Sequence, residues 1–412
     1  MKRVIFVLDQ FTYRAGELIA AAQKLGLAVV IAAEQPSNIP SASPEAQLSI
    51  QLHDPVGAAK MLVEFAGKHP VDAVVAPEAA GAEIAARSSK ALKLPHSSLE
   101  ALQAAGNKAL MREKLQAAGI KTPQFWRFKI SDGAEKIAGQ VKFPCVIKPL
   151  NLSGGLGLVK VDQPDALADG LARLRAVLEA AAVQQIPGVL TGEIIVEEYI
   201  SGEEAVQEGV LVDGDIVPMV LFDKTLAAER GSFIEETYIT PSKHASEGKR
   251  KAFMAALRAC GALGLTHGPV HVDVILQPED TYVIDVSPRT VGGYVSKAAG
   301  FGTGRTQEEV VLRNALGEDH QIIRRENSAA GILMMTAKRT GRLENVAGTG
   351  EAEKVQNVEE VLINLNPGQD TISPQGQTLN IGHIVSRAAD REAVEKALHA
   401  AFSKINFTFT GE

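Results

Sequence analysis

The chain has 412 residues, of which 45% are hydrophobic and 22% charged, and its formal net charge is −7. This length predicts about three domains, and the negative charge argues against wholesale nucleic-acid binding, which needs a basic face. The first apolar run, Val4–Leu8, is too short for a signal peptide, and no stretch approaches the roughly 20 apolar residues that cross a bilayer. We expect a soluble cytoplasmic protein without nucleic-acid or membrane partners.

The first 96 residues alternate between apolar runs and helical patterns. Continuous apolar runs are typical of strands buried on both faces of a parallel sheet, and three occur here, at Val4–Leu8, Ala28–Ala32 and Ala73–Ala76. Helical patterns over Gly16–Leu25 and Pro55–Lys68 separate them, so we predict an open α/β domain over residues 1–96. Leu8 is followed by Asp9-Gln10-Phe11 rather than G-x-G-x-x-G, and a nicotinamide cofactor is therefore not expected.

Residues 97–200 carry a lysine and a glycine-rich segment that could hold phosphates. We predict helices over Asn107–Ala118 and Asp165–Ala182 and strands over Cys145–Pro149, Leu158–Val161 and Ile194–Tyr199. Lys148 lies in the first of these strands, and a flexible turn follows it with Ser153, Gly154, Gly155 and Gly157. Glycines let backbone N–H groups approach an oxyanion, although such turns are also common as purely structural hairpins. No G-x-x-x-x-G-K-[ST] pattern occurs in the chain.

The strand that ends this region has features of an adenosine site. Its edge, Glu197-Glu198-Tyr199-Ile200, exposes backbone groups that could read an adenine ring, and Glu204 follows as a candidate partner of the ribose hydroxyls. An ordinary junction between a strand and a turn would look the same. Cys145 and Cys260 both lie in apolar stretches, which predicts two buried thiols without a disulfide or a catalytic role.

Residues 201–325 contain a hairpin that brings two aspartates together. Gln277–Asp280 reads as a tight turn, and matching the apolar faces pairs Val272 with Val286, Val274 with Ile284 and Leu276 with Tyr282. In this register Asp273 lies opposite Asp285, and His271 lies opposite Ser287. Two carboxylates roughly 5 Å apart repel each other unless a cation lies between them. Arg289 and the Gly292-Gly293 pair follow directly, so the segment predicts a divalent-metal and phosphate site, against the alternative of a solvated hairpin face.

The order of these motifs resembles the ATP-grasp superfamily. The resemblance covers residues 1–325 and runs from Lys108 through the Lys148 strand, the glycine turn and the Glu197–Ile200 edge to the aspartate hairpin. Residues 326–412 read as a small α+β unit with a terminal helix near Arg391–Phe402. In this unit Lys338–Leu343, Asn366–Gly368 and Ile381–Val385 are similar to the C-terminal domain of bacterial L-amino-acid ligases, which are dipeptide synthetases.

The resemblance implies a fold and a domain organisation. An α/β domain over residues 1–96 precedes an α+β ATP-grasp fold whose two subdomains grip ATP. The smaller, lid subdomain spans residues 97–200, and the larger one, with the metal site, spans residues 201–325. A small α+β domain over residues 326–412 follows. The implied cofactors are ATP and Mg²⁺, or Mn²⁺ in its place; the implied partners are carboxylate and amine substrates, with amino acids expected, and a second copy of the chain in a homodimer.

The resemblance also implies a role for each motif. Lys108, Lys148 and the Ser153–Gly157 turn would contact the phosphates, Glu197–Ile200 the adenine and Glu204 the ribose. Arg289 would stabilise the transferring phosphoryl group, with Gly292 and Gly293 beside the substrate. The metal ligands would be Asp273, Asp285 and Ser287. His271 would touch substrate unless it is simply a hydrogen-bonded strand histidine, and Glu235 or Glu236, in the loop Gly231–Glu236, would meet a substrate ammonium group.

The implied activity is a ligation in which a carboxylate attacks ATP to form an acyl phosphate, and an amine then displaces phosphate. The chain departs from the family pattern at two positions. Asp285-x-Ser287-x-Arg289 replaces the usual Glu-x-Asn-x-Arg, and Asp273 stands where Glu is frequent. These shorter ligands keep one alternative open, a regulatory nucleotide-binding protein without ligase activity. Another alternative keeps the fold and changes the substrate, as in a carboxylase-like or purine-pathway ligase.

Overall fold

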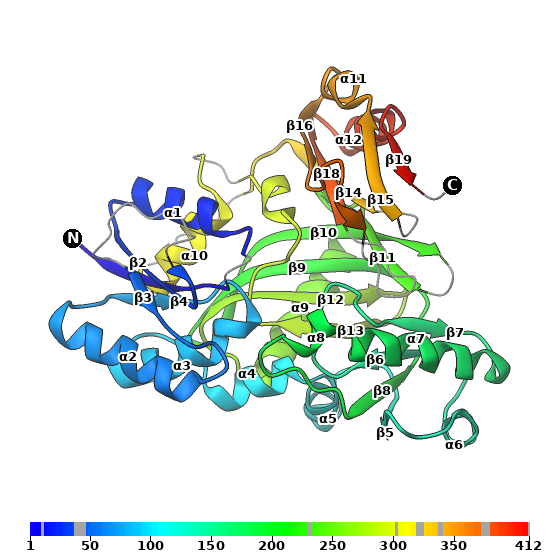
Figure 1. Cartoon of the computed structure of the whole chain (residues 1–412), viewed down its shortest axis with the longest axis horizontal. Coiled ribbons are helices and arrows are strands. Elements are labelled where there is room, and N and C mark those ends of the chain that lie inside the picture. Colours follow the sequence, from blue (N-terminus) through cyan, green and yellow to red (C-terminus); the bar gives the residue numbers. More distant parts are fainter. Residues whose placement is uncertain are drawn as a thin grey trace.

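A computed structural model of the chain describes residues 1–9, 12–36, 47–229, 232–300, 304–318, 325–336, 341–371 and 380–410. Within these residues the strands form sheets of four, twelve and three strands. In Figure 1 the N-terminal sheet lies at the left, the large sheet crosses the centre, and the C-terminal part rises at the upper right. Cys145 and Cys260 are buried and unbonded to each other, as predicted.

The N-terminal sheet is parallel, as the continuous apolar runs predicted, with strand order β3-β2-β1-β4. Its strands are β1 (Arg3–Val7), β2 (Ala28–Ala33), β3 (Gln47–Ser49) and β4 (Ala73–Val75). The sequence analysis missed β3, which is only three residues long. The helices of this part are α1 (Ala15–Lys24), α2 (Pro55–Lys68) and α3 (Ala79–Leu92). α2 and α3 cover one face of the sheet, and α1 covers the other.

A helix from much later in the chain completes the N-terminal layer. α10 (Gln307–Ala315) packs beside α1, and Val311 and Leu312 belong to the same hydrophobic core as Phe6 and Ile31. Figure 1 shows this yellow helix beside the blue N-terminal elements. The N-terminal sheet is therefore tied to the large sheet through a helix that the chain reaches only after the aspartate hairpin.

The large sheet runs β13-β12-β9-β10-β11-β7-β6-β8-β5, and β14, β18 and β16 extend it from β11. Every described pair in it is antiparallel. Its strands are β5 (Phe125–Lys129), β6 (Cys145–Pro149), β7 (Val159–Val161), β8 (Glu193–Glu198), β9 (Glu203–Val212), β10 (Asp215–Glu229), β11 (Ser232–Thr240), β12 (Gly268–Leu276), β13 (Thr281–Ser287), β14 (Ala329–Thr336), β16 (Val358–Ile363) and β18 (Asn380–Ala388).

Two groups of helices support this sheet. One group packs under β9, β12 and β13 and consists of α4 (Leu99–Gly106), α5 (Lys108–Ala117) and α9 (Ser246–Leu263). The other group lies with β5–β8 and consists of α6 (Ala134–Ala138), the 3-10 turn η3 (Pro164–Ala166), α7 (Leu167–Glu179) and α8 (Ala181–Gln184). The single helix predicted over Asp165–Ala182 is therefore wrong, because the chain breaks at Ala180, whose backbone is extended.

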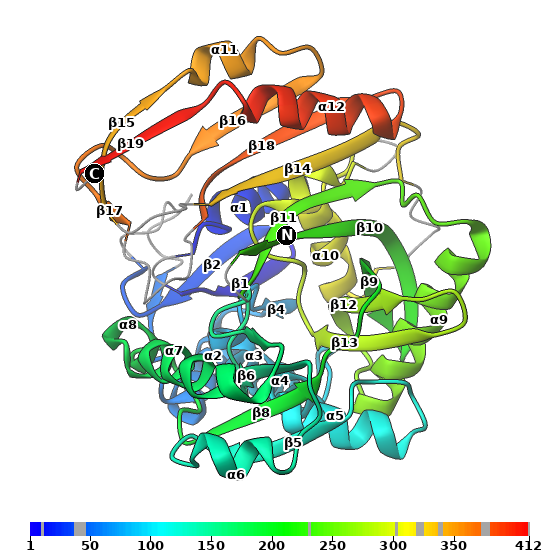
Figure 2. The ribbon, with the colours of Figure 1, turned by 90° about the vertical axis from the view of Figure 1, so that its right-hand side faces the viewer.

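The C-terminal part is α+β, as predicted. A second short turn, η4 (Val295–Ala298), precedes it, and its small sheet has the order β17-β15-β19. These strands are β15 (Gly341–Ala347), β17 (Asp370–Thr371) and β19 (Asn406–Thr410), and the helices are α11 (Thr349–Glu353) and α12 (Arg391–Phe402). Figure 2 shows α12 lying along β14 and β18, at the end of the molecule away from β5 and α6. Lys338–Thr340 of the tail motif lies outside the described residues.

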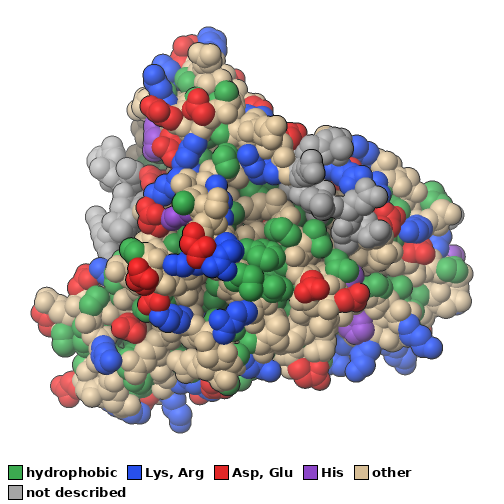
Figure 3. All heavy atoms as spheres, turned by 180° about the vertical axis from the view of Figure 1, so that it is seen from behind, with side chains coloured by type: hydrophobic (Ala, Val, Ile, Leu, Met, Phe, Trp, Pro, Cys, Tyr) green, Lys and Arg blue, Asp and Glu red, His purple; other side chains and the backbone are tan. Residues whose placement is uncertain are grey.

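The surface mixes charges of both signs. On the face seen in Figure 3, lysine and arginine side chains are interspersed with aspartate and glutamate. Among the described residues no helix combines the length and the apolar character that a bilayer span requires.

Candidate active site

A cavity of about 870 Å³ gathers residues from the N-terminal sheet, both groups of the large sheet and the C-terminal part. Its wall includes most of the residues that the sequence singled out: Lys108, Lys148, Ser153, Gly154, Gly155, Glu197, Glu198, Tyr199, Ile200, Glu204, Glu235, His271, Asp273, Asp285, Arg289, Gly292 and Gly293. These positions are spread over nearly 200 residues of sequence, so their convergence on one cavity is a property of the tertiary fold.

Gly157, Glu236 and Ser287 are not among the residues that line this cavity. A Cβ on Gly157 would lie 2.9 Å from Leu174 of α7, so this glycine permits close packing against the core. Ser287 donates its hydroxyl to Asp285 Oδ2 at 3.3 Å. Glu236 follows Glu235 on β11 and lies at an irregularity in the β10–β11 pairing, where Thr237 and Glu235 have register partners and Glu236 has none. Gly231 of the predicted substrate loop lies outside the described residues.

The aspartate hairpin has the predicted register at its functional end. Asp273 pairs with Asp285, and His271 pairs with Ser287. The predicted pairs beyond this point are wrong: Val274 lies opposite Val283, not Ile284, and Leu276 lies opposite Thr281, not Tyr282. A bulge inserts one residue into β13. Val283 and Val286 are thus both buried, while Ile284 and Asp285, between them, both line the cavity.

Three ligand-type side chains meet at this end of the hairpin. Atoms of His271, Asp273 and Asp285 that could bind a metal ion all lie within 4.8 Å of one another. Burial, with Arg289 nearby, lowers the pKa of His271 to about 3, so its imidazole is neutral. Burial alone would raise the pKa of Asp285, but Lys108, His271, Arg112 and Lys148 outweigh it and lower that pKa to about 2. Two carboxyl groups on facing strands are an oxygen-rich set that fits Mg²⁺.

A buried ion-pair group stands beside the hairpin. Glu197 Oε2 accepts a hydrogen bond from Lys148 Nζ at 2.6 Å, and Glu197 Oε1 lies 2.9 Å from Arg112 Nη2. Burial would raise the pKa of Glu197, but the guanidinium of Arg112 and the ammonium group of Lys148 lower it. Arg112 also donates to the carbonyl of Ile284, which ties α5 to the bulge in β13. The carboxylate of Glu197 therefore orients two cations.

Lys108 connects the glycine turn to the hairpin. Its Nζ donates to the carbonyl of Leu152 at 2.9 Å and lies 3.8 Å from Asp285 Oδ1. Lys108 is the first residue of α5, so Arg112 follows one turn later on the same face of the helix. That i, i+4 spacing could have identified Arg112 from the sequence, but the sequence analysis did not select it.

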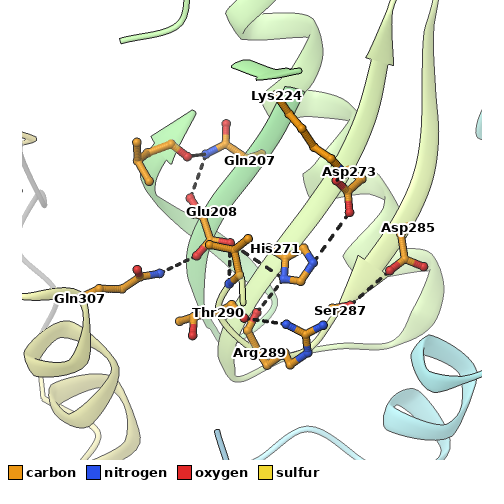
Figure 4. Close-up of polar contacts among 12 residues, drawn as sticks. Gln207, Glu208, Lys224, His271, Asp273, Asp285, Ser287, Arg289, Thr290 and Gln307 are labelled. Carbon is orange, nitrogen blue, oxygen red and sulfur yellow. Dashed lines mark hydrogen bonds and ion pairs between the residues drawn. The ribbon is translucent and has the colours of Figure 1, made fainter. Parts of the chain in front are cut away.

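Lys224 of β10 is the second functional residue that the sequence analysis missed. Its Nζ lies 3.1 Å from Asp273 Oδ1, 3.3 Å from Glu235 Oε1 and 3.4 Å from Glu204 Oε2. Burial alone would lower the pKa of Lys224, but Asp273 and the other carboxylates raise it well above its usual value. Figure 4 shows Lys224 extending toward Asp273, although β9 lies between their two strands. The ammonium group of Lys224 is thus the shared ion-pair partner of three carboxylates that were predicted to bind ligands.

The loop after the hairpin is held from the N-terminal side. Arg14 donates to the Thr290 hydroxyl and, at 2.5 Å, to the carbonyl of Val291. The Gly293 N–H donates to the Tyr13 hydroxyl at 2.7 Å. Arg289 Nη1 donates to the carbonyl of Thr290 at 2.9 Å, which curls the guanidinium back over the loop. Arg289 and the two glycines are thereby presented to the cavity on a backbone with several fixed points.

Two backbone N–H groups of the strand edge that was predicted to bind adenine donate hydrogen bonds within the protein. The N–H of Glu198 donates to the carbonyl of Gln124, and the N–H of Tyr199 donates to the carbonyl of Pro144. Ile200, the next residue, also lines the cavity.

Comparisons with known proteins identify the family. Three family models match the chain: an ATP-grasp N-terminal domain over residues 19–96, an ATP-grasp domain over residues 141–298, and L-amino acid ligase C-terminal domain 2 over residues 333–410. The chain therefore belongs to the ATP-grasp superfamily, and its relatives place it among the ATP-dependent carbon–nitrogen ligases of that superfamily. Within that class it is similar to the bacterial L-amino-acid ligases, whose C-terminal domain it shares.

Two curated relatives illustrate the similarity. Alanine–anticapsin ligase of Bacillus amyloliquefaciens is 25% identical over 246 residues, which cover 56% of this chain and 51% of that protein. The match therefore spans about half the length of that relative. Dapdiamide A synthase of Enterobacter agglomerans is 24% identical over 338 residues, which cover 81% of this chain and 73% of that protein.

Solved structures share the fold over the whole chain. The crystal structure of the L-amino acid ligase from Bacillus licheniformis matches with a TM-score of 0.83 at 22% identity and covers 100% of this chain and 99% of that one. N5-carboxyaminoimidazole ribonucleotide synthetase from Thermotoga maritima matches with a TM-score of 0.69 at 16% identity and covers 99% of this chain and 100% of that one. These structural likenesses concern the fold.

Proposed function

We propose that this protein is an ATP-dependent ligase that joins the carboxylate of one amino acid to the amine of another and releases ADP and phosphate. The observation that carries the proposal is the facing pair Asp273 and Asp285, which lines one cavity together with Lys108, Lys148 and Arg289. Relatives named as amino-acid ligases supply the substrate class. A homodimer and a cytoplasmic location are the expectations that go with this class.

We assign the end of the cavity nearest Lys108 and Lys148 to the nucleotide. Both lysines line the wall together with Ser153, Gly154 and Gly155, and would neutralise the phosphates of ATP. The carboxylate of Glu197 fixes Lys148, so this cation is already oriented before a nucleotide arrives. With the Glu198 and Tyr199 amides engaged elsewhere, we assign the adenine contact to the backbone at Ile200. To bind the ribose hydroxyls, the carboxylate of Glu204 would have to give up its ion pair with Lys224.

Asp273 and Asp285 would hold Mg²⁺, with Ser287 orienting the second carboxylate through its hydroxyl. Bound there, the ion would offset the negative charge of the phosphates during transfer. Lys224 already compensates one oxygen of Asp273, which leaves the other oxygen for the ion. The bulge at Ile284 turns Asp285 toward the cavity, so its carboxylate faces the site although aspartate is shorter than the usual glutamate.

We assign the opposite end of the cavity, at Arg289, Gly292 and Gly293, to the amino-acid substrates. Arg289 would bind the carboxylate and stabilise the phosphoryl group that passes to it. An acyl phosphate would form, and a substrate amine would displace the phosphate. The neutral imidazole of His271 can accept a hydrogen bond there, and Glu235 would meet an ammonium group. Chemistry of this kind depends on positioning and charge neutralisation more than on a protein nucleophile.

The test is a substrate matrix read by phosphate release and by product mass. Amino acids and small dicarboxylates serve as carboxylate donors, amino acids serve as acceptors, and bicarbonate with an amine covers the carboxylase-like alternative. The proposal predicts Mg²⁺-dependent phosphate release with at least one amino-acid pair and a product of the dipeptide mass. Tight MgATP binding with no release for any pair would support the regulatory alternative, and release with bicarbonate alone would move the chain to another substrate class.

A further inference from the structure

Glu208 of β9 is a buried carboxylate behind the wall of the candidate active site. Its exposed fraction is 0%, and it is not among the residues that line the cavity. Glu208 lies opposite His271 in the strand register, and its Oε1 lies 3.9 Å from His271 Nδ1. Among the residues that the structure describes, no lysine or arginine nitrogen lies within 4.0 Å of it. Burying a carboxylate without such a partner is costly unless its oxygens are hydrogen-bonded.

Both oxygens of Glu208 accept hydrogen bonds from separate parts of the chain. Oε1 accepts from the backbone N–H of Val291 at 3.1 Å, and Oε2 accepts from Gln307 Nε2 at 2.5 Å. Figure 4 shows Glu208 pointing between Gln307 and His271, with Arg289 and Thr290 below. One carboxylate thus joins the loop that presents Arg289 and the glycine pair to the first residue of α10.

The two partners differ in what they fix. Val291 immediately precedes Gly292; Glu208 binds its N–H and Arg14 binds its carbonyl, so both backbone polar groups of Val291 are held. Gln307 opens α10, whose Val311 and Leu312 are buried in the core of the N-terminal sheet. The substrate-facing loop is therefore anchored to the N-terminal layer both through Arg14 and through the Glu208–Gln307 pair.

We propose that Glu208 is a positioning residue for the substrate end of the site, and that Gln307 couples it to the docking of the N-terminal layer. The inference rests on the proposed function for its kinetic consequence, but the placement of the loop can be tested without activity. The bonding pattern, and not the negative charge, is what positions the loop. In E208Q the side-chain oxygen at position 208 can still accept from the Val291 N–H. The new NH₂ group at position 208 can donate to the Gln307 side-chain oxygen once the Gln307 amide has rotated. An alanine can do neither.

The experiment compares E208A, E208Q and Q307A with the unmodified protein. Hydrogen–deuterium exchange of the peptide containing Val291 should be faster in E208A, unchanged in E208Q, and slightly faster in Q307A. The KM for the carboxylate amino acid should rise roughly tenfold in E208A, as expected for a lost buried hydrogen bond. The affinity for MgATP should stay within about twofold, because Glu208 does not touch the nucleotide end.

D54A is the matched control. Asp54 caps α2 by accepting from the Gly57 N–H, on the opposite face of the N-terminal sheet. This variant should lower the Tm without changing exchange at Val291 or the KM. Unchanged exchange in E208A, or an E208Q variant as impaired as E208A, would overturn the inference. Faster exchange in E208A, in a protein that shows no ligase activity with any substrate, would instead reject the proposed function while the positioning role stands.

Discussion

Asp273 on β12 lies directly opposite Asp285 on β13, yet the two carboxylates are served by different cations. Asp273 Oδ1 accepts a hydrogen bond from Lys224 Nζ at 3.1 Å, whereas Asp285 Oδ1 lies 3.8 Å from Lys108 Nζ. Lys224 comes from β10, which β9 separates from β12, and Lys108 comes from α5 beneath the sheet. Each acid is therefore compensated from outside the pair, and the space between the two remains suited to a divalent ion.

We expect D285N to abolish the dependence of nucleotide binding on Mg²⁺. The substitution removes one of two facing carboxylates, and an amide is a much weaker ligand for a hard cation. Isothermal titration of ATP with and without Mg²⁺ measures the effect. D280N is the control, because Asp280 lies in the turn of the same hairpin and pairs with Lys121 at the surface. Equal Mg²⁺ dependence in D285N and D280N would contradict the assignment.

We expect His271 to make the protein less stable in acid. Its pKa is about 3 in the folded chain and about 6.5 in an unfolded one. Between these values the unfolded chain binds a proton that the folded chain excludes, so the free energy of unfolding falls as the pH falls from about 6.5 toward 3. H271N cannot titrate and should lose less stability between about pH 7 and pH 4.5. Urea denaturation at several pH values gives the slope of the free energy of unfolding against pH for the unmodified protein and for H271N. Equal slopes in the two proteins would refute the prediction.

We expect K224A to destabilise the metal-free protein strongly. The substitution leaves Glu204, Glu235 and Asp273 without their shared cation, and removing one partner of a buried ion pair costs about 3–5 kcal/mol. Because a divalent ion near Asp273 can replace part of the lost positive charge, added Mg²⁺ should recover some of the loss. Chemical denaturation with and without Mg²⁺ measures both effects.

K121A is the control for this substitution. Lys121 pairs with Asp280 at an exposed position, so its loss should change the free energy of unfolding far less than the loss of Lys224. If K224A were as stable as K121A, the buried cluster would not hold the site together in the way its geometry indicates.

We expect G293A to impair the substrate end of the cavity, and M334A to restore part of the function. Gly293 has φ +68, and a Cβ added to it would lie 2.4 Å from Met334 Cε. Alanine would thus meet both a strained backbone and a steric clash with the C-terminal part. Shortening Met334 removes only the clash. KM values for the amino-acid substrate in the two single variants and the double variant form a thermodynamic cycle; strictly additive effects would show that the contact is unimportant.

Much of the fold was readable from local pattern. The predicted helices over Pro55–Lys68 and Arg391–Phe402 and the strand over Cys145–Pro149 coincide with α2, α12 and β6. Apolar periodicity and capping residues act within a few residues of one another, so such elements carry their own signal. The Asp273–Asp285 pairing was readable for another reason: matching the apolar faces of the two strands sets Val272 opposite Val286, which brings the adjoining Asp273 and Asp285 together.

The same reasoning could not detect the bulge at Ile284, because alternation with a period of two contains no information about an inserted residue. The packing of Val283 and Val286 into one core decides it. That bulge turns Asp285 toward the cavity, so a feature invisible to the pattern orients a central candidate ligand.

The order of motifs along the chain was by itself enough to identify the superfamily, since each motif is short and its residue types indicate its chemistry. The tertiary structure alone decided which cation meets which carboxylate. Lys224 and Asp273 are 49 residues apart, Glu208 and Gln307 are 99 apart, and α10 returns to a layer that begins at residue 3. Contacts of this kind depend on how separate elements pack, and no local periodicity encodes them.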